Sequence, residues 1–332
     1  MAVSIEDIKK LRHMTGAGLS DCKKALEETG SDIQAAIEII RKKGQAVAAK
    51  REDRQASEGC VFSGVNGNFA AIVALKCETD FVAKNESFRT LAKTLLNAAL
   101  DKQPKDMDAL KALALEDGRT VADHITDEIG KTGEKMELGA YEWIEAPSVA
   151  AYDHLGNKLA TIVGLNKVVE NAQVGKEVAM QVAAMNPVAA TRAQVPQATV
   201  DEEYKVAVEK TKEEQVKKAV EAAIRKAGLN PNHFDSEDHI ESNITKGWIT
   251  AEEAEKGRAI AKETAEKKAA SLPEAMIQKI AEGRINKFYK ESVLMEQGFV
   301  REDGKVTVGQ YLESVDKGLE VVTFKRVNLN ED

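Results

Sequence analysis

The sequence predicts an α+β protein in which a three-helix domain precedes a core of two repeated α+β subdomains, the second interrupted by a helical arm. Three observations predict this fold. Three short helical patterns occupy residues 1–44, a turn-strand-helix pattern occurs twice further on, and an Ala-, Glu- and Lys-rich helical stretch interrupts the second copy. Helices and strands mixed in this way are typical of α+β domains.

The first 44 residues are expected to form a compact bundle. Ser20 is the expected cap of its second helix, Ser31–Gln34 has the pattern of a capping box for the third, and Gly44 is expected to close that helix. Bundles of this size are typically binding modules. Residues 45–58 are mostly Ala, Lys, Arg, Glu and Gln, which predicts a helical or flexible linker.

Residues 59–147 are expected to form the first half of the core. Asn66-Gly67 indicates a type I′ turn, and residues 69–75 form a nearly continuous apolar strand after it. An amphipathic helix follows the segment 79–85. Thr120 opens a further helix through a capping box.

The same pattern returns roughly 90 residues later, as expected of an internal repeat. Gly67-Asn68 and its strand resemble Gly156-Asn157 and the apolar residues 159–165. We therefore assign a related second half of the core to residues 148–186 and 280–332, with strand-rich sequence resuming near 306–327.

Residues 187–279 interrupt the second half of the core. The stretches 201–226 and 251–270 are expected to be long exposed helices of mixed charge, and Thr250 and Ser271 each begin a capping-box pattern. Their apolar seams are thin and dominated by Ala, which fits an antiparallel, coiled-coil-like helical arm or a weak dimer contact.

The composition is that of a soluble globular protein of about two or three domains. The 332 residues are 43% hydrophobic and 31% charged, with a net charge of -8, which argues against binding to nucleic acid or to an anionic membrane. No apolar run approaches the roughly 20 residues that span a bilayer, and the start of the chain lacks a targeting signal. The three cysteines, Cys22, Cys60 and Cys77, predict free thiols in a cytoplasmic protein.

Two stretches have some features of a site for nucleotide or metal chemistry. Gly130-Lys131-Thr132 matches the end of a phosphate-binding loop, but that motif needs Gly where this chain has Ile125. The cluster between His233 and His239 contains metal-ligand types, yet a solvated loop with Ser236 as a helix cap is favoured. We therefore assign no catalytic residue, cofactor or metal ligand, and no motif supports an enzyme.

The segment 79–85 is the most informative stretch of the chain. It follows a buried strand and precedes an amphipathic helix, so rigid elements hold it on both sides, as suits recognition. A plainer interpretation is that Asp80 caps a helical turn and that Phe81 packs in the core. Residue chemistry alone favours the plainer interpretation.

Three stretches resemble the translation elongation factor Ts family. They are Leu11–Leu26, which contains the turn Thr15-Gly16-Ala17-Gly18, then Cys77–Lys84, and near the end Thr307–Leu312. Because the first two have the order and spacing of the family, the resemblance is specific. It covers residues 1 to about 200 and about 270 to 326.

This resemblance implies an N-terminal domain similar to ubiquitin-associated (UBA) domains, a two-part core and a dimerisation arm. It implies a guanine-nucleotide exchange factor that binds elongation factor Tu and promotes GDP release during translation elongation, without covalent chemistry. A tip formed by Thr79, Asp80, Phe81 and Val82 would wedge into the GTPase domain and disturb the Mg²⁺ site of the partner. The N-terminal domain would bind the same GTPase domain through Leu11, Thr15, Gly16, Gly18, Leu19 and Lys23, and the second core half would hold a more distant domain.

The helical arm supports an alternative hypothesis. Residues 228–268 exceed the arm of many members of that family, and their role is open. The alternative is an interaction scaffold whose helical arm is the main working surface and pairs with a second copy of the chain. An unrecognised enzyme is a third hypothesis, without a motif in its support.

Overall fold

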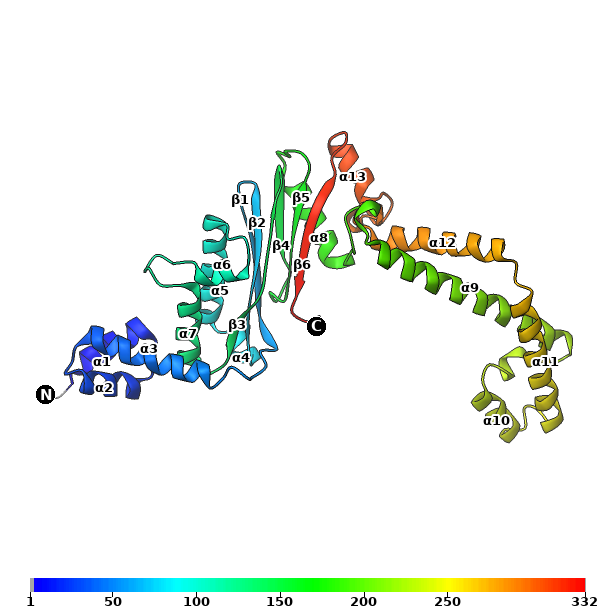
Figure 1. Ribbon diagram of the computed structural model, residues 1–332, viewed down its shortest axis with the longest axis horizontal. Coiled ribbons are helices and arrows are strands. Elements are labelled where there is room, and N and C mark those ends of the chain that lie inside the picture. Colours follow the sequence, from blue (N-terminus) through cyan, green and yellow to red (C-terminus); the bar gives the residue numbers. More distant parts are fainter. Residues whose placement is uncertain (1–2, 332) are drawn as a thin grey trace. The chain divides into compact units, whose positions relative to one another are not determined.

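The computed structural model describes residues 3–331 and divides into two compact units (Figure 1). The main unit comprises Met1–Thr191 with Leu294–Asp332, and the helical unit comprises Arg192–Val293. The sequence placed the insertion at residues 187–279. The helical unit ends later because helix α12 (Glu274–Ser292) continues across the expected boundary.

Three helices form the N-terminal bundle: α1 (Ile5–Thr15), α2 (Leu19–Glu28) and α3 (Ile33–Ala49). Its core consists of buried side chains from all three helices and the first turn: Leu11, Ala17, Cys22, Ala25, Leu26, Ala36 and Ile37. Ser4 caps α1 by accepting a hydrogen bond from the backbone N–H of Asp7, and Gly16 ends the helix in the left-handed conformation. Local capping residues therefore set both ends of α1.

In this bundle two of the expected caps are wrong. Helix α2 begins at Leu19 after Gly18, so Ser20 lies inside the first turn instead of capping it. Helix α3 is capped by Asp32, whose carboxylate accepts from the backbone N–H of Ala35 at 3.1 Å. Ser31 does not cap because its backbone is left-handed, with φ of 72°, and this turn moves the N-cap position to the next residue.

Gly44 does not close α3, which continues to Ala49. It lies where α3 packs against α7 (Val121–Thr132), opposite Gly130. A Cβ on Gly130 would lie 2.8 Å from the Cα of Gly44, so the backbones meet without intervening side chains. Gly44 therefore serves helix packing, and the expected linker begins only after Ala49.

The first half of the core is a three-stranded antiparallel sheet with helices on one face. Its strands are β1 (Glu58–Asn66), β2 (Phe69–Cys77) and β3 (Met136–Glu145), in the order β1-β2-β3. Its helices are α4 (Asp80–Ala83), α5 (Glu86–Lys102), α6 (Met107–Ala112) and α7. The type I′ turn expected at Asn66-Gly67 is wrong: Asn66 still pairs with Phe69, so Gly67 and Asn68 form the turn, and only Gly67 of these has a positive φ, of 60°. The capping box predicted at Thr120 is confirmed.

The second half repeats this plan with a long interruption. Its strands are β4 (Ser148–Asp153), β5 (Leu159–Leu165) and β6 (Val321–Asn328), in the order β4-β5-β6. Its helices are α8 (Ala172–Met185) and α13 (Val308–Val315), with short 3₁₀ turns at Leu294–Glu296 and Val300–Glu302. The expectation of strand-rich sequence from 306 onward is wrong for its first part, because Thr307 and Gln310 form a capping box that starts α13.

The two sheets pack face to face, as Figure 1 shows, so that β2 is buried on both sides. One face of β2 contacts the helices through Phe69, Val73 and Leu75, in the largest of the hydrophobic clusters. The other face contacts the second sheet through Ala70, Ile72 and Ala74. The α+β class is confirmed, and β2 and β5, the two strands of the repeat, each lie at the centre of a sheet.

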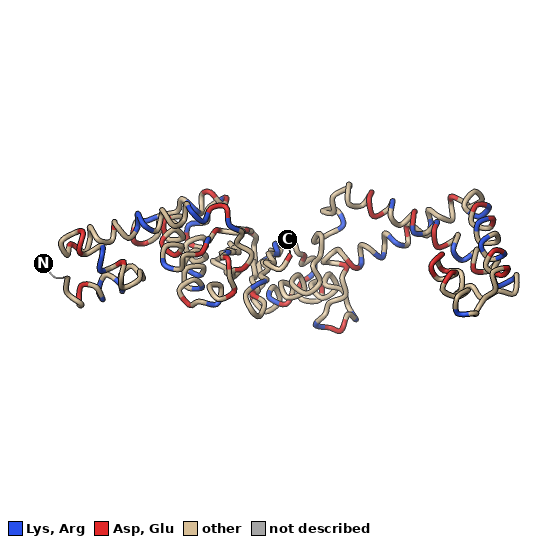
Figure 2. The backbone as a smooth tube through the Cα atoms, turned by 90° about the horizontal axis from the view of Figure 1, so that it is seen from below, with Lys and Arg blue, Asp and Glu red and all other residues tan. Residues whose placement is uncertain are grey.

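The helical unit contains α9 (Gln197–Lys226), α10 (Glu237–Thr245), α11 (Ala251–Ala270) and α12, with 3₁₀ turns at Arg192–Gln194 and Pro231–His233. Helix α9 packs against both α11 and α12. The Thr250 capping box is confirmed, whereas α12 starts after Pro273 without the expected Ser271 cap. Ser236 caps α10, as expected. Figure 2 shows acidic and basic residues interspersed along these helices.

The contact between α3 and α7 gives a matched pair of substitutions. We expect Gly130→Ala to destabilise the protein by about 1–3 kcal/mol, since its Cβ would press on the backbone of α3. Gly44→Ala should be neutral or stabilise by up to about 1 kcal/mol, because its Cβ meets the Cα of Gly130 at an ordinary 3.6 Å and Ala favours helix. Chemical denaturation measures both. Equal stability of the two variants would contradict this account of the contact.

Candidate functional site

A protruding tip follows β2, where the single helical turn α4 begins. Thr79 caps this turn, and its hydroxyl accepts from the backbone N–H of Val82 at 3.4 Å. Ala83 is buried and Val82 packs against the core, but Phe81 is 82% exposed. The plainer interpretation of this segment is therefore wrong on both points: Thr79 is the cap, and the Phe81 ring lies in solvent.

Asp80 and Lys84 form an exposed pair on the same turn. The Lys84 Nζ lies 2.6 Å from the Asp80 carboxylate, and this hydrogen bond lowers the pKa of Asp80. Both side chains are well exposed. Because surface pairs of this kind contribute little to stability, Asp80 is available to a new partner at low cost.

Two carboxylates that sequence reasoning missed hold the base of the tip. Glu134 accepts from the Thr79 hydroxyl at 2.7 Å and from the Thr79 backbone N–H at 3.0 Å. Glu78 accepts from the backbone N–H of Lys135 at 2.7 Å and pairs with Arg54 at 2.8 Å. The segment that enters the tip and the loop between α7 and β3 therefore bind each other reciprocally.

The pairing of β2 with β3 explains this arrangement. Cys77 at the end of β2 lies opposite Met136 at the start of β3. Continuing the antiparallel register by two positions places Glu78 beside Lys135 and Thr79 beside Glu134. The contacts of Glu78 and Glu134 thus follow from the register of β2 and β3. They can be predicted only when these two strands are known to pair.

Cys77 lies directly beneath the tip and is completely buried. Its thiol donates to the backbone carbonyl of Thr79 at 3.2 Å. Burial, reinforced by the nearby charge of Glu134, raises the pKa of Cys77 to about 12. The neutral thiol therefore acts as a packing and hydrogen-bonding group.

The N-terminal bundle presents a second candidate surface around the turn after α1. Thr15 donates to the carbonyl of Leu11 at 2.7 Å and accepts from the N–H of Ala17, which fixes the turn at Gly16. Leu19, beside Gly18, is 52% exposed, and Lys23 is exposed and paired with Glu27. Leu11, by contrast, is fully buried. The expectation that Leu11 contacts a partner is therefore corrected to a packing role in the bundle core.

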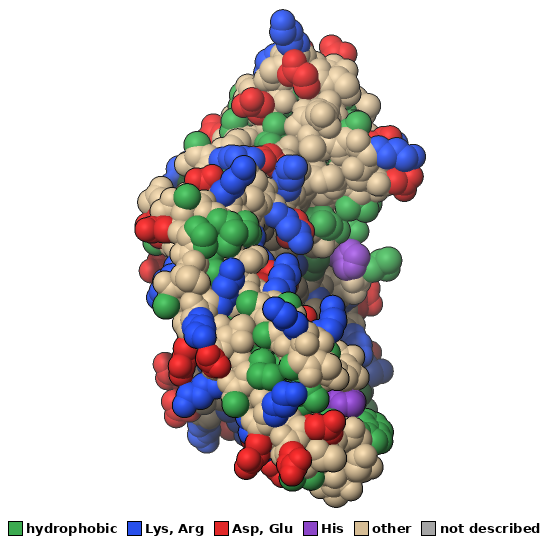
Figure 3. All heavy atoms as spheres, turned by 90° about the vertical axis from the view of Figure 1, so that its right-hand side faces the viewer, with side chains coloured by type: hydrophobic (Ala, Val, Ile, Leu, Met, Phe, Trp, Pro, Cys, Tyr) green, Lys and Arg blue, Asp and Glu red, His purple; other side chains and the backbone are tan. Residues whose placement is uncertain are grey.

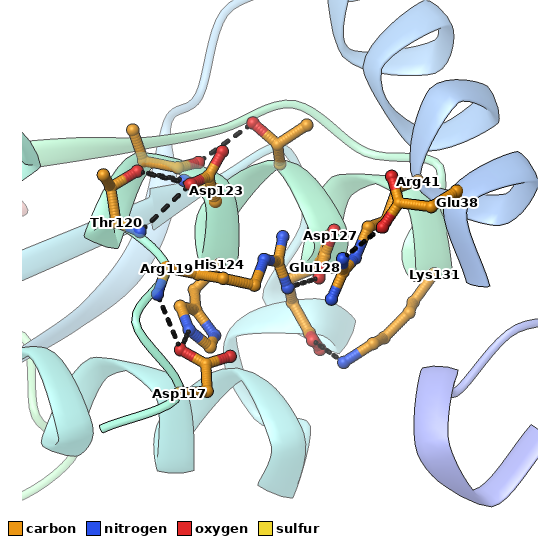
Figure 4. A network of polar contacts seen from close by, with 12 residues as sticks. Glu38, Arg41, Asp117, Arg119, Thr120, Asp123, His124, Asp127, Glu128 and Lys131 are labelled. Atoms are coloured by element: carbon orange, nitrogen blue, oxygen red, sulfur yellow. Dashed lines mark hydrogen bonds and ion pairs between the residues drawn. The ribbon is translucent and has the colours of Figure 1, made fainter. Parts of the chain in front are cut away.

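A cleft of about 910 Å³ lies between the bundle and the first half of the core. Figure 4 shows a row of polar side chains along α7 at this cleft. Arg119 pairs with Asp127 at 2.5 Å, and His124 lies 3.1 Å from Asp117. Because acidic and basic side chains are interspersed along its walls, the cleft does not present a field of one sign.

The triplet Gly130-Lys131-Thr132 lies at the end of α7, next to this cleft. The carboxylate of Glu128 is buried and accepts hydrogen bonds from the Ser87 hydroxyl and the Lys131 ammonium. Thr132 donates back to the carbonyl of Glu128 at 3.0 Å. The Lys131 side chain also covers Gly16 of the bundle. Internal contacts thus account for the three residues that resembled the end of a phosphate-binding loop.

An apolar groove of about 520 Å³ lies in the second half of the core, between α8 and the segment after the helical unit. Its walls include Tyr152, Met180, Phe299 and Val300. At its edge the buried carboxylate of Glu177 accepts from the Tyr311 hydroxyl at 2.8 Å and forms an ion pair with Arg301. The groove is therefore an apolar surface with a fixed polar margin.

The surface of the molecule carries mixed charge. On the face drawn in Figure 3, basic and acidic side chains are interspersed and apolar groups lie between them. Among the side chains that the structure describes, no group of three or more His, Cys, Asp or Glu is placed to hold a metal ion. No helix within residues 3–331 is both long enough and apolar enough to cross a membrane.

An exposed aromatic ring on a capped turn, with an apolar groove on the same fold, is the kind of surface that suits contact with another protein. Comparison with known proteins gives the family. The family model for elongation factor Ts matches residues 78–233 and 223–331. The chain is 51% identical to elongation factor Ts of Parabacteroides distasonis and 52% identical to those of Phocaeicola vulgatus and Bacteroides thetaiotaomicron, each over 100% of both chains. This chain belongs to the elongation factor Ts family of translation elongation factors.

The buried base of the tip predicts unreactive thiols. With the pKa of Cys77 raised to about 12 and that of Cys60 to about 11, both stay protonated near neutral pH and are shielded from solvent. Iodoacetamide at about pH 8 should label them at least about 100-fold more slowly in the native protein than in denaturant. Mass spectrometry of tryptic peptides measures this. Native labelling of Cys77 at the rate of a free thiol would show that the base opens readily.

Proposed function

We propose that this protein is a guanine-nucleotide exchange factor that binds elongation factor Tu and promotes its release of GDP. The observation that carries the proposal is the exposure of Phe81 on a capped turn whose base is buried. Membership of the elongation factor Ts family supports the same partner.

In this proposal Phe81 inserts into the GTPase domain of elongation factor Tu beside the nucleotide site. Burying a Phe side chain contributes roughly 1.5–3 kcal/mol, which helps offset the distortion of the partner. Mg²⁺ requires near-ideal octahedral geometry and bridges the nucleotide phosphates, so a small shift of its supporting elements weakens nucleotide binding strongly. Release of GDP follows from this displacement and needs no covalent chemistry by the factor.

The rest of the tip orients this insertion. Thr79 caps the turn and Val82 anchors it to the core, while Asp80 is free to leave Lys84 for a donor on the partner. We assign the turn Thr15–Gly18 with Leu19 and Lys23 to a second contact with the GTPase domain. The apolar groove beside Met180 is assigned to a more distant domain of the same partner.

The proposed exchange activity is reciprocal by thermodynamic linkage. If the factor weakens nucleotide binding, nucleotide weakens binding of the factor by the same ratio. The protein therefore accelerates exchange in both directions, and the nucleotide concentrations decide which nucleotide is loaded.

Phe81→Ala tests the proposal directly. We expect the stimulated rate of GDP release to fall about 10- to 100-fold, because the burial of the ring is lost. The fold should be intact, since the ring makes little contact with the core. Release of a fluorescent GDP analogue from cognate elongation factor Tu, followed by stopped flow, measures the rate.

Val65→Ala is the matched control for this substitution. Val65 is also an exposed apolar residue, at 49%, but it lies at the opposite end of the β1–β2 hairpin from the tip. Its removal should leave the release rate unchanged. Unchanged stimulation by Phe81→Ala would refute the assignment of Phe81 as the wedge.

A second candidate function is an interaction scaffold that pairs through the helical unit. The observation that favours it is a groove of about 530 Å³ along α9, with walls that include Val216, Val220, Phe234 and Leu272. In the same unit Trp248 is 62% exposed, with the Lys246 ammonium 5.0 Å from its ring centre. Apolar surface of this kind is suited to a contact with a second copy of the chain.

Deleting residues 228–268 separates the two candidates. If the helical unit mediates dimerisation, self-association measured by sedimentation equilibrium should fall while stimulated GDP release persists. Phe81→Ala is the reciprocal control, because it should keep self-association and lose exchange. Loss of exchange on deletion would place the working surface in the helical unit and overturn the assignment of the tip.

A further inference from the structure

The tip is held at its base by charged hydrogen bonds from a loop distant in sequence. Thr79 and Glu134 are 55 positions apart, yet one carboxylate receives both the backbone N–H and the hydroxyl of Thr79. Hydrogen bonds to an ionised acceptor are shorter and stronger than neutral ones, and 2.7 Å to the hydroxyl is in their range.

These two bonds act at the residue that caps α4. The Thr79 hydroxyl donates to Glu134 and accepts from the backbone N–H of Val82. Its donor proton is therefore aimed away from the turn, which leaves an acceptor lone pair directed at the N–H of Val82. Glu134 thereby sets the orientation of the cap, and the cap sets the turn that carries Phe81.

The linker that follows the N-terminal bundle also contacts the base of the tip. Arg54 pairs with Glu78 at 2.8 Å, and the Lys135 ammonium donates to the carbonyl of Glu52 at 2.9 Å. Glu78, in turn, accepts from the backbone N–H of Lys135. Three chain segments therefore meet at the entrance to the tip: the linker, the end of β2 and the loop before β3.

We propose that Glu134 is a positioning residue that holds the Phe81 tip in its active orientation, an inference that rests on the exchange function proposed above. A carboxylate is required because both groups of Thr79 that face it are donors. Glutamine has one acceptor oxygen and one amide nitrogen that only donates. It therefore preserves the shape of the side chain but can accept fully from only one of the two Thr79 donors.

The first measurement is the hydrogen exchange of the tip itself, which does not depend on any partner. In Glu134→Ala, the backbone N–H groups of Thr79 and Val82 should exchange about tenfold faster or more, because their shared support is lost. The amides of β2 should be unchanged. Glu134→Gln should give an intermediate effect, and it keeps the test available if the alanine variant folds poorly.

The second measurement is the stimulated GDP release of the full-length protein with elongation factor Tu. At saturating factor, Glu134→Ala should lower the maximal rate about tenfold, with a smaller change in the factor concentration that gives half-maximal stimulation. Thr79→Val, which removes the hydroxyl donor to Glu134, should lower the maximal rate in the same direction as Glu134→Ala. Combining Thr79→Val with Glu134→Ala should cost less than the sum of the two single effects, because both remove the hydrogen bond from the Thr79 hydroxyl to the Glu134 carboxylate.

Glu137→Ala is the matched control. Glu137 lies on the same stretch of chain, at the start of β3, and the ion pair that the structure gives it is with the Lys135 ammonium at 3.3 Å. It should change neither the exchange of the tip amides nor the release rate.

The outcomes separate this inference from the proposed function. Unchanged hydrogen exchange at Thr79 and Val82 in Glu134→Ala overturns the positioning role. Faster exchange with an unchanged release rate, while Phe81→Ala still slows release, also overturns it, because tip order would then not matter. If neither Glu134→Ala nor Phe81→Ala alters release, the proposed function of the tip fails, and with it the role that Glu134 would serve.

Discussion

Strand β2 is buried on both of its faces, and the position of the candidate site depends on that burial. Helices cover one face through Phe69, Val73 and Leu75, and the second sheet covers the other through Ile72. Each such side chain contributes roughly 1.5–3 kcal/mol when it leaves water. A strand fixed from both sides gives the segment after Cys77 an immobile base, so the chain can turn outward there without the turn becoming loose.

The tip combines an apolar ring in solvent with polar contacts at its base, the reverse of the usual placement of such groups. Phe81 contributes little to folding because it is exposed. The polar side chains beneath it are partly buried and make hydrogen bonds to specific partners. The core and the contacts at the base thus hold an exposed aromatic side chain at a fixed place on the surface.

The N-terminal bundle and the tip are connected through the main unit by two contacts of different kinds. The glycine contact between α3 and α7 lets two helix backbones approach closely, and the linker after Ala49 is held at Glu78 through Arg54. The first contact involves α7, and Glu78 in the second also accepts a hydrogen bond from Lys135 in the loop that follows α7. A partner that binds both the bundle and the tip would therefore meet two surfaces supported by one helix and its loop.

The sequence by itself determined the features that local hydrogen bonding and hydrophobic pattern encode. The α+β class, the repeated central strands and the capping boxes at Thr120 and Thr250 follow from residues a few positions apart. Residue chemistry left the exposure of Phe81 to the tertiary structure, since an aromatic residue beside a helix start fits a core or a surface equally well, and only the family resemblance implied an exposed ring. The tertiary structure also decided that Gly44 packs instead of ending a helix, and that Glu134 supports Thr79. Those outcomes depend on which strands and helices meet, and contacts across 55 or more positions leave no periodic signal in the chain.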